Sequence, residues 1–240
     1  MEITYLLNSG FMVRDKNILI VFDDFDDPAK VVDRAFDDDF KYLYIFASHA
    51  HFDHFDTHIR AYAPKVSRYI FSNDIRRTKR VKMFPPDKIT YMKKYSDWQD
   101  DIITVETFDS TDVGVSFLVE TRNKKIFHAG DFNWWHWADD TPENINLAKR
   151  IFKKQLKLME NLQADVAFFP VDGRLGDSQE MGVTEFIKNT QVKTLVAMHR
   201  VGYPEWIPSE NFFTQARNLP IWSPTISGDS IKLIGDKFIK

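Results

Sequence analysis

The pattern of apolar and polar positions predicts a chain made mainly of short, buried strands. Short apolar runs rich in β-branched or aromatic residues, bounded by Gly, Pro, Asn or Asp, are typical of strands. Such runs lie at 3–7, 17–22, 42–47, 66–72, 101–108, 114–120, 124–129, 165–170, 192–198, 220–222 and 230–234. We expect the first two strands to be neighbours that are joined across a turn.

Helices are predicted between these strands. The longest spans about 142–162, where Ile145, Ile151 and Leu156 recur close to helical spacing. Shorter helices are predicted at 29–36, 55–62, 178–189 and 209–217. Since strands come first in each half of the chain and helices follow, we expect an α/β fold in which two packed sheets carry helices on their outer faces, a four-layer αββα sandwich.

Length and composition favour a single folding unit. The chain has 240 residues, of which 43% are apolar, and this is enough for one sizeable core. We therefore expect one domain over 1–240. A basic run at 76–82 lies inside the segment 73–98, which we expect to be an insertion into that domain.

Charge and residue content narrow the chemistry. The formal net charge is −3, so a general nucleic-acid binder or membrane binder is not expected. The chain has no cysteine, so any metal would have to be held by nitrogen and oxygen atoms. The first residues do not resemble a signal peptide and no apolar run is long enough to cross a bilayer. We therefore expect a cytoplasmic protein with no membrane partner.

The densest chemical motif directly follows the predicted strand 42–47. Residues 49–54 have the sequence His-Ala-His-Phe-Asp-His and hold three of the seven histidines. Side chains two apart on an extended strand end lie on one side, so His49 and His51 are placed to hold one metal ion. Asp53 and His54 follow where the chain turns away, and they are placed to face a second ion. A histidine-rich surface loop is the alternative interpretation.

Two further predicted strands end in side chains of the kind that bind metals. The strand 124–129 runs into Gly130 and Asp131. A carboxylate after a glycine, which permits close backbone approach, suits a bridging ligand. The strand 192–198 is followed by His199. Since coincidence at three strand ends is improbable, the pattern as a whole predicts a metal centre.

With these motifs the sequence resembles the metallo-β-lactamase superfamily, a large group of metal-dependent hydrolases. The resemblance rests on the H-x-H-x-D-H run at 49–54, the Gly-Asp at 130–131 and His199. Residues 165–172 are similar to the small bacterial branch that includes ascorbate-phosphate lactonase. The resemblance implies the αββα fold of that superfamily and a metal-activated water as the attacking group.

The resemblance also implies a role for each of the six motif residues. A first metal would be bound by His49 and His51, a second by Asp53, His54 and His199, and Asp131 would bridge the two. One or two divalent ions are implied, with zinc expected first and manganese or iron as alternatives.

The sequence departs from the family pattern in one place. Members usually carry a further first-site histidine before the glycine that opens the strand ahead of Gly-Asp, but residues 109–114 contain none. Ser110, Thr111 or Asp112 occupies that position, and the register is left open. If Asp112 substitutes, the more oxygen-rich site favours manganese or iron over zinc. If nothing substitutes, the first metal is weakly held.

Two residues are candidates for catalysis. Asp53 would hold the attacking water by a hydrogen bond and later move a proton. His136 lies in the run Asn-Trp-Trp-His-Trp at 133–137, directly after Asp131, and is a candidate proton donor or metal contact. The tryptophans of this run would either stack on a planar substrate or pack the loop onto the domain.

Other polar residues have two interpretations each. Asp24, Asp56 and Asp172 are candidates to orient imidazole ligands, or are ordinary turn and cap residues. Arg174 and Arg200 would bind a phosphate or carboxylate, or form surface ion pairs. Two remaining histidines are expected to have no metal: His128 to hydrogen-bond inside the sandwich, and His58 to lie at the surface or beside the site.

The leading hypothesis is a metal-dependent hydrolase whose partner is a small-molecule ester, lactone or phosphodiester. A nuclease-like protein that uses the basic segment 73–98 is the runner-up, although we expect no nucleic-acid partner. A metal-binding protein with a degraded catalytic site is the third alternative, and it is motivated by the missing histidine.

Overall fold

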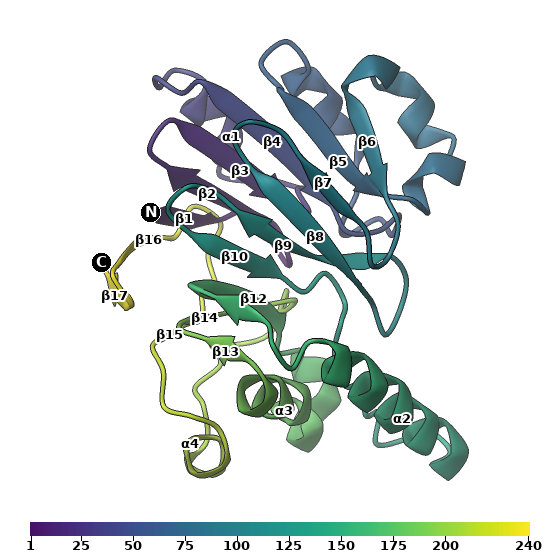
Figure 1. Cartoon of the computed structure of the whole chain (residues 1–240). Coiled ribbons are helices and arrows are strands. Elements are labelled where there is room, and N and C mark those ends of the chain that lie inside the picture. Colours follow the sequence, from purple (N-terminus) through teal and green to yellow (C-terminus); the bar gives the residue numbers. More distant parts are fainter.

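The computed structural model describes all of residues 1–240 and consists of two packed β-sheets with helices on the outer faces (Figure 1). The first sheet has the strand order β17-β16-β1-β2-β3-β4-β5-β6. Its strands are β1 (Glu2–Tyr5), β2 (Phe11–Asp15), β3 (Ile18–Phe22), β4 (Tyr42–Ala47), β5 (Arg68–Ser72), β6 (Ile89–Met92), β16 (Ser230–Ile234) and β17 (Lys237–Ile239).

The second sheet has the order β15-β14-β12-β10-β9-β8-β7. Its strands are β7 (Asp97–Gln99), β8 (Thr104–Asp109), β9 (Val115–Glu120), β10 (Lys125–His128), β12 (Val166–Pro170), β14 (Leu195–Met198) and β15 (Ile221–Trp222). A separate small ladder pairs β11 (Gln163–Ala164) with β13 (Gln191–Val192).

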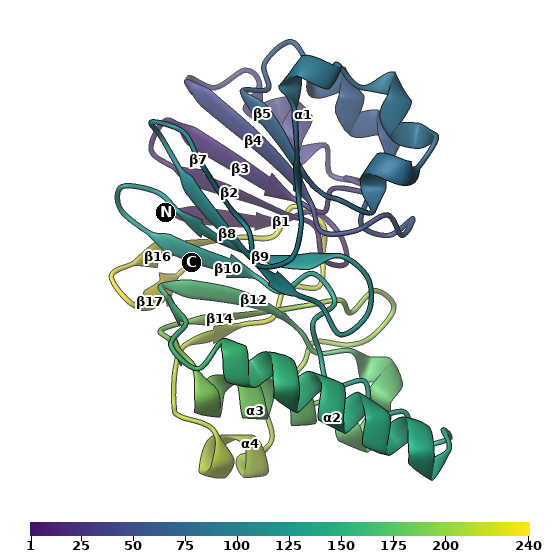
Figure 2. The same ribbon diagram turned by 45° about the vertical axis from the view of Figure 1, so that its right-hand side comes forward.

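Helices cover the outer face of each sheet. Against the second sheet lie α2 (Pro142–Leu158), α3 (Met181–Asn189) and α4 (Glu210–Gln215), as Figure 2 shows. Against the first sheet lie α1 (Val31–Ala35) and the 3₁₀ turns η1 (Thr57–Tyr62), η2 (Ile75–Arg77), η3 (Arg80–Met83) and η4 (Pro86–Lys88), whereas η5 (Gly173–Ser178) follows β12. No helix is both long and apolar enough to cross a bilayer. The predicted four-layer αββα sandwich is confirmed.

The alternation of side chains along the strands divides the core into two parts. In β4, Tyr44 and Phe46 belong to the large core of 46 buried residues, which includes the space between the sheets. Leu43, Ile45 and Ala47 of the same strand belong to a second core of 19 buried residues, which they form with α1 and the 3₁₀ turns. Since successive side chains of a strand point to opposite faces, a continuous apolar run is what a strand buried on both faces requires.

Several strands were not predicted, and they are mostly short or at a sheet edge. The strands of 3–7 and 17–22 are not neighbours, because β2 lies between β1 and β3. The apolar run of β2 is only Phe-Met-Val, and this is too short to stand out between two turns. The segment 73–98 supplies β6 and most of β7, each of which is one edge strand of its sheet.

Candidate metal centre

The predicted motif residues lie at one end of the sandwich, where buried parallel strands end. The loop with His49, His51 and His54 follows β4, Asp131 follows β10, and His199 directly follows β14. Strands β3 and β4 run parallel, as do β10, β12 and β14. Because the carboxyl ends of parallel strands meet at one edge of a sheet, this topology collects residues from distant parts of the chain.

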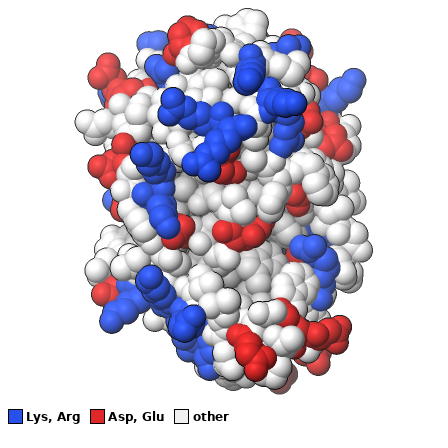
Figure 3. All heavy atoms as spheres, turned by 90° about the vertical axis from the view of Figure 1, so that its right-hand side faces the viewer, with Lys and Arg blue, Asp and Glu red and all other residues white.

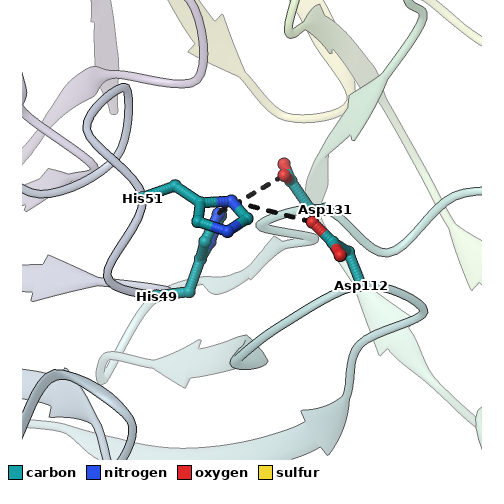
Figure 4. Close-up of side chains that lie close together, drawn as sticks. All are labelled: His49, His51, Asp112 and Asp131. Atoms are coloured by element: carbon teal, nitrogen blue, oxygen red, sulfur yellow. Dashed lines mark hydrogen bonds and ion pairs between the residues drawn. The ribbon is translucent and has the colours of Figure 1, made fainter. Parts of the chain in front are cut away.

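A first group of ligand-type atoms comes from His49, His51, Asp112 and Asp131 (Figure 4). His49 Nε2 lies 3.0 Å from His51 Nδ1 and 3.4 Å from Asp131 Oδ2. His51 Nδ1 lies 3.7 Å from Asp112 Oδ2. Atoms bound to one ion at about 2.1 Å lie about 3.0–3.4 Å from one another, so the first two separations suit a shared cation and the third is slightly longer. About half of the His51 and Asp112 side chains is exposed, so the group opens to solvent on their side.

A second group is formed by Asp53, His54 and His199. Asp53 Oδ2 lies 3.6 Å from His54 Nε2 and 3.7 Å from His199 Nε2. The other oxygen of Asp131, Oδ1, lies 3.3 Å from His54 Nε2 and 3.6 Å from His199 Nε2. Asp131 therefore faces the first group with one carboxylate oxygen and the second group with the other.

The chemistry of these atoms fits a bound cation. His54 Nε2 and Asp131 Oδ1 are buried and have no hydrogen-bond partner, which is costly for polar atoms unless something else satisfies them. Burial, together with the charges of Asp23 and Asp53, raises the pKa of Asp131 to about 7. Burial also lowers the pKa values of His49 and His54, so that both imidazoles stay neutral and keep a free lone pair. A divalent ion would compensate the carboxylates and use the lone pairs.

One buried carboxylate orients two of these histidines. Asp23 accepts a hydrogen bond from His54 Nδ1 at 2.8 Å and one from Ser48 Oγ at 2.7 Å. Ser48 Oγ lies 3.0 Å from His49 Nδ1, so it accepts the proton of that nitrogen while donating its own to Asp23. Nε2 of both rings is thereby left as the ligand atom, in the way that metal-binding imidazoles are usually held.

A second carboxylate orients His199. Asp172 accepts a hydrogen bond from His199 Nδ1 at 3.0 Å and two from Arg174 Nε, at 2.9 and 3.0 Å. Burial alone would raise the pKa of Asp172, but the hydrogen bonds from His199 and Arg174 outweigh it and lower the pKa to about 2. Asp172 is therefore ionised at neutral pH and fixes His199 with Nε2 toward Asp53 and Asp131.

The backbone at the site takes conformations that side chains rarely adopt. Asn8, Asp23 and His199 all have positive φ, at 55°, 43° and 61°. Asn8 contacts two of the motif residues, because Asn8 O accepts from His199 N at 3.0 Å and Asn8 Nδ2 donates to Asp53 Oδ2 at 3.1 Å. Strain of this kind persists only where surrounding contacts impose it, and it gathers at functional sites.

Comparison with known proteins gives a consistent result for the fold. No family model matches the chain, and no curated protein matches it by sequence. Among solved structures, Igni18, a metallo hydrolase from Ignicoccus hospitalis, is 16% identical over 95% of this chain and 96% of its own, with a TM-score of 0.65. YhfI from Bacillus subtilis, a metallo-β-lactamase fold protein, is 11% identical over 95% and 97%, with a TM-score of 0.59. The short form of human tRNase Z is 14% identical over 97% and 99%, with a TM-score of 0.55.

The chain has the metallo-β-lactamase fold. The resemblance noted in the sequence is thus confirmed at the level of architecture. At these identities the likeness says nothing of substrate, because one fold hosts many activities.

Within the metallo-β-lactamase fold, the six predicted ligands fall into the two groups that the resemblance implied. The structure brings together His49 and His51 on one side, Asp53, His54 and His199 on the other, and Asp131 between them. Their role as ligands stays a prediction.

Of the three residues considered for the missing histidine, Asp112 has its carboxylate in the first group. Ser110 instead accepts a hydrogen bond from Asp112 N at 3.2 Å, and the Thr111 hydroxyl donates to the carbonyls of Asp131 and Asn133.

Other candidates have different places. Asp24 and Asp56 contact His58 rather than a residue of either group. Asp24 Oδ1 lies 3.1 Å from His58 Nε2, and Asp56 Oδ1 lies 3.2 Å from His58 Nδ1. The expected hydrogen bond of His128 inside the sandwich is confirmed, because its Nε2 lies 2.9 Å from Ser9 O. Arg200 is buried and donates to Ser223 Oγ and Pro204 O, so it neither forms a surface ion pair nor faces the site.

The rim residues after Asp131 divide into two kinds. Trp134 is buried and stacks on Phe152 of α2, which is the packing role. Trp135 and Trp137 line a cavity of about 590 Å³ over the two groups, together with Phe52 and Arg174. His136 is not among the residues that line this cavity, and its ring contacts Trp134.

Three important residues were missed: Asn8, Asp23 and Ser48. Asp23 did carry a recognisable signal, because it directly follows an apolar strand, as His199 does. Nothing local marks Asn8, whose contacts to Asp53 and His199 span 45 and nearly 200 positions.

Proposed function

We propose that the protein is a metal-dependent hydrolase that uses two divalent ions to cleave a small ester, lactone or phosphodiester. The observation that carries this proposal is the pair of adjoining groups, with Asp131 facing the first by Oδ2 and the second by Oδ1, at the base of a cavity. Ions held by these residues would make a hydroxide available at neutral pH, because a bound divalent metal lowers the pKa of water from about 16 toward 7.

The residues of the chain would divide the remaining work. Asp53 lines the cavity, is held by Asn8 Nδ2, and would hold the attacking water by a hydrogen bond and accept its proton. Asp23 and Asp172 keep the imidazoles of His54 and His199 in the tautomer that leaves Nε2 free. Such preorganisation reduces the rearrangement that the reaction would otherwise require.

Each proposed metal position offers two imidazole nitrogens and two carboxylate oxygens, if Asp131 serves both. This ligand set can bind zinc. With Asp112 in place of a histidine, however, the first position has more oxygen ligands than is usual in the superfamily, and oxygen ligands favour manganese or iron. Metal analysis of the purified protein, with reconstitution of the stripped protein by each ion, identifies the metal.

The partners of the basic side chains favour a small substrate over a nucleic acid. Lys and Arg side chains gather in the upper part of one face (Figure 3), near the 3₁₀ turns that follow β5. Several of the basic groups there already have internal partners, however. Arg80 donates to the carbonyls of Ala50 and Phe55, and Lys88 Nζ donates to those of Ala63 and Val66. These two cations stabilise the loop that holds the histidine motif and the segment that precedes β5. Fewer basic side chains are therefore free to contact phosphates.

The test compares ligand variants with a histidine outside both groups. His51→Ala and Asp131→Ala are each expected to lose metal and to reduce turnover by about 100-fold or more on a panel of 4-nitrophenyl esters, lactones and bis(4-nitrophenyl) phosphate. His58→Gln should retain both. Circular dichroism checks that the variants are folded. Full activity in either ligand variant refutes the mechanism, and bound metal without turnover on the whole panel supports a binding protein instead.

A further inference from the structure

Apart from the proposed metal ligands, the wall of the cavity consists of a few aromatic side chains and one cation. The aromatic side chains are Phe52, Trp135 and Trp137, and the cation is Arg174. No lysine and no second arginine lines it. Its volume of about 590 Å³ lies within the range of small-molecule sites.

Arg174 is held in place on two sides. Its Nε and Nη2 donate to the buried carboxylate of Asp172, and its guanidinium lies 5.5 Å from the centre of the Trp137 ring. Nη1 makes no hydrogen bond to the protein, and about half of the side chain is exposed. A guanidinium fixed in this way loses little side-chain entropy when its free edge binds an oxyanion.

The two tryptophans form a fixed apolar surface beside this cation. Trp135 Nε1 donates to the carbonyl of Asp131 at 3.0 Å, and its ring meets that of His199 edge-on at 5.7 Å. The rings of Trp135 and Trp137 lie at 5.9 Å with only 7° between their planes. Neither ring is buried in the core, unlike Trp134, so both present apolar area to the cavity.

We propose that the site selects small substrates that combine a planar apolar group with an oxyanion, a carboxylate or phosphate, and that Arg174 is the residue that recognises the oxyanion. The planar group would lie on Trp135 and Trp137 while the oxyanion meets Nη1 of Arg174. This proposal rests on the proposed function for the reaction but makes its own claim about which ligand binds.

Charge supports this choice of substrate. Asp53, Asp112 and Asp131 also line the cavity, and the proposed metal ions would neutralise their negative charges. Arg174 is the only other charged group of the wall, and it would repel a substrate with an amine. A neutral acceptor would form a hydrogen bond to Arg174 but no ion pair, whereas an oxyanion would form both and therefore bind more strongly.

The test measures binding by calorimetry on the full-length, metal-loaded protein, with three matched probes. These are 1-naphthoate, 1-naphthyl phosphate and the neutral 1-naphthamide. The unaltered protein is expected to bind at least one of the two anions about tenfold or more tightly than the amide. Whichever anion binds more tightly relative to the amide identifies carboxylate or phosphate as the recognised group.

Three variants assign the preference. Arg174→Gln removes the charge but can still donate to Asp172, and it should reduce anion binding about tenfold and amide binding far less. Arg174→Lys should restore part of the loss. Arg77→Gln removes an exposed arginine that does not line the cavity and should change nothing. The metal content of every variant is measured, since Asp172 also contacts His199.

Three results would overturn the proposal. One is unchanged naphthoate and naphthyl phosphate binding in Arg174→Gln, which would mean that the metal ions alone hold the oxyanion. Another is an equal loss of affinity for the amide and for the anions in Arg174→Gln. The third is the absence of any anion preference in the unaltered protein. Because none of these measurements requires turnover, anion selectivity without hydrolysis would sink the proposed function and leave this inference standing.

Discussion

The carboxylate of Asp23 accepts a hydrogen bond from Nδ1 of His54 at 2.8 Å, although 31 positions separate the two residues. Both side chains are fully buried. The contact sets the tautomer of His54 and leaves its Nε2 without a protein partner, 3.3 Å from Asp131 Oδ1. The end of β3 thus determines which nitrogen the loop after β4 offers to a metal.

Removing the charge of Asp23 should weaken metal binding without removing a ligand. Asp23→Asn is expected to reduce affinity at the second proposed position about 10–100-fold, because partners that orient a ligand are worth that much. Metal titration of the stripped protein measures the effect. Asp24→Asn is the matched control, since the neighbouring buried carboxylate contacts His58 instead. Equal weakening in both variants would contradict the role of Asp23.

Asp112 should determine the metal preference of the first proposed position. Asp112→Ala is expected to lose about one ion per chain, whereas Asp112→His should shift the preference toward zinc, because imidazole is a softer ligand than carboxylate. Elemental analysis after growth with mixed metals reports both effects. Ser110→Ala is the control, and a loss of metal in that variant with none in Asp112→Ala would reverse the assignment.

Gly114 should be indispensable for the geometry of the loop after β4 that carries Ser48 and His49. Its φ is +83°, and a β-carbon there would lie 2.0 Å from Ser48 O and 2.5 Å from the β-carbon of His49. Gly114→Ala is therefore expected to cost more than about 3 kcal/mol of unfolding free energy and to displace His49.

Gly235 provides the comparison, because it has a φ of +60° and nothing within 4 Å of its added β-carbon. Gly235→Ala should cost only about 1–2 kcal/mol, the conformational penalty alone. Urea denaturation compares the two, and equal losses would show that contact with Ser48 is unimportant.

His58 should make stability depend on pH. Burial lowers its pKa, but Asp24 and Asp56 outweigh this by hydrogen bonds and charge and raise the pKa to about 9. Since the folded state holds the proton more tightly, the stabilisation is complete below about pH 6.5 and is lost as the pH rises through 9. His58→Gln should thus cost about 1–2 kcal/mol at pH 6, after allowance for the 35% exposure of the side chain, and almost nothing at pH 10. A cost that is the same at both pH values would contradict this account.

Local sequence was sufficient for the architecture and for the main motif. The apolar runs at 42–47 and 165–170 predicted β4 and β12 to within a residue or so, because strands buried on both faces need continuous apolar sequence. The H-x-H-x-D-H order at 49–54 likewise predicted that His49 and His51 share one group, although both lie in the loop after β4 and not on the strand itself. Short edge strands such as β6 and β7 were missed, since few of their residues are buried and they leave little pattern.

Only the tertiary structure decided how the distant parts meet. The sequence by itself determined the long buried strands, their apolar faces and the kind of side chain at their ends, because these depend on neighbours along the chain. It left open whether Ser110, Thr111 or Asp112 faces His51, and it gave no sign that Asn8 holds Asp53. Those facts follow from the register between strands and from turns with positive φ, which packing across the whole domain imposes.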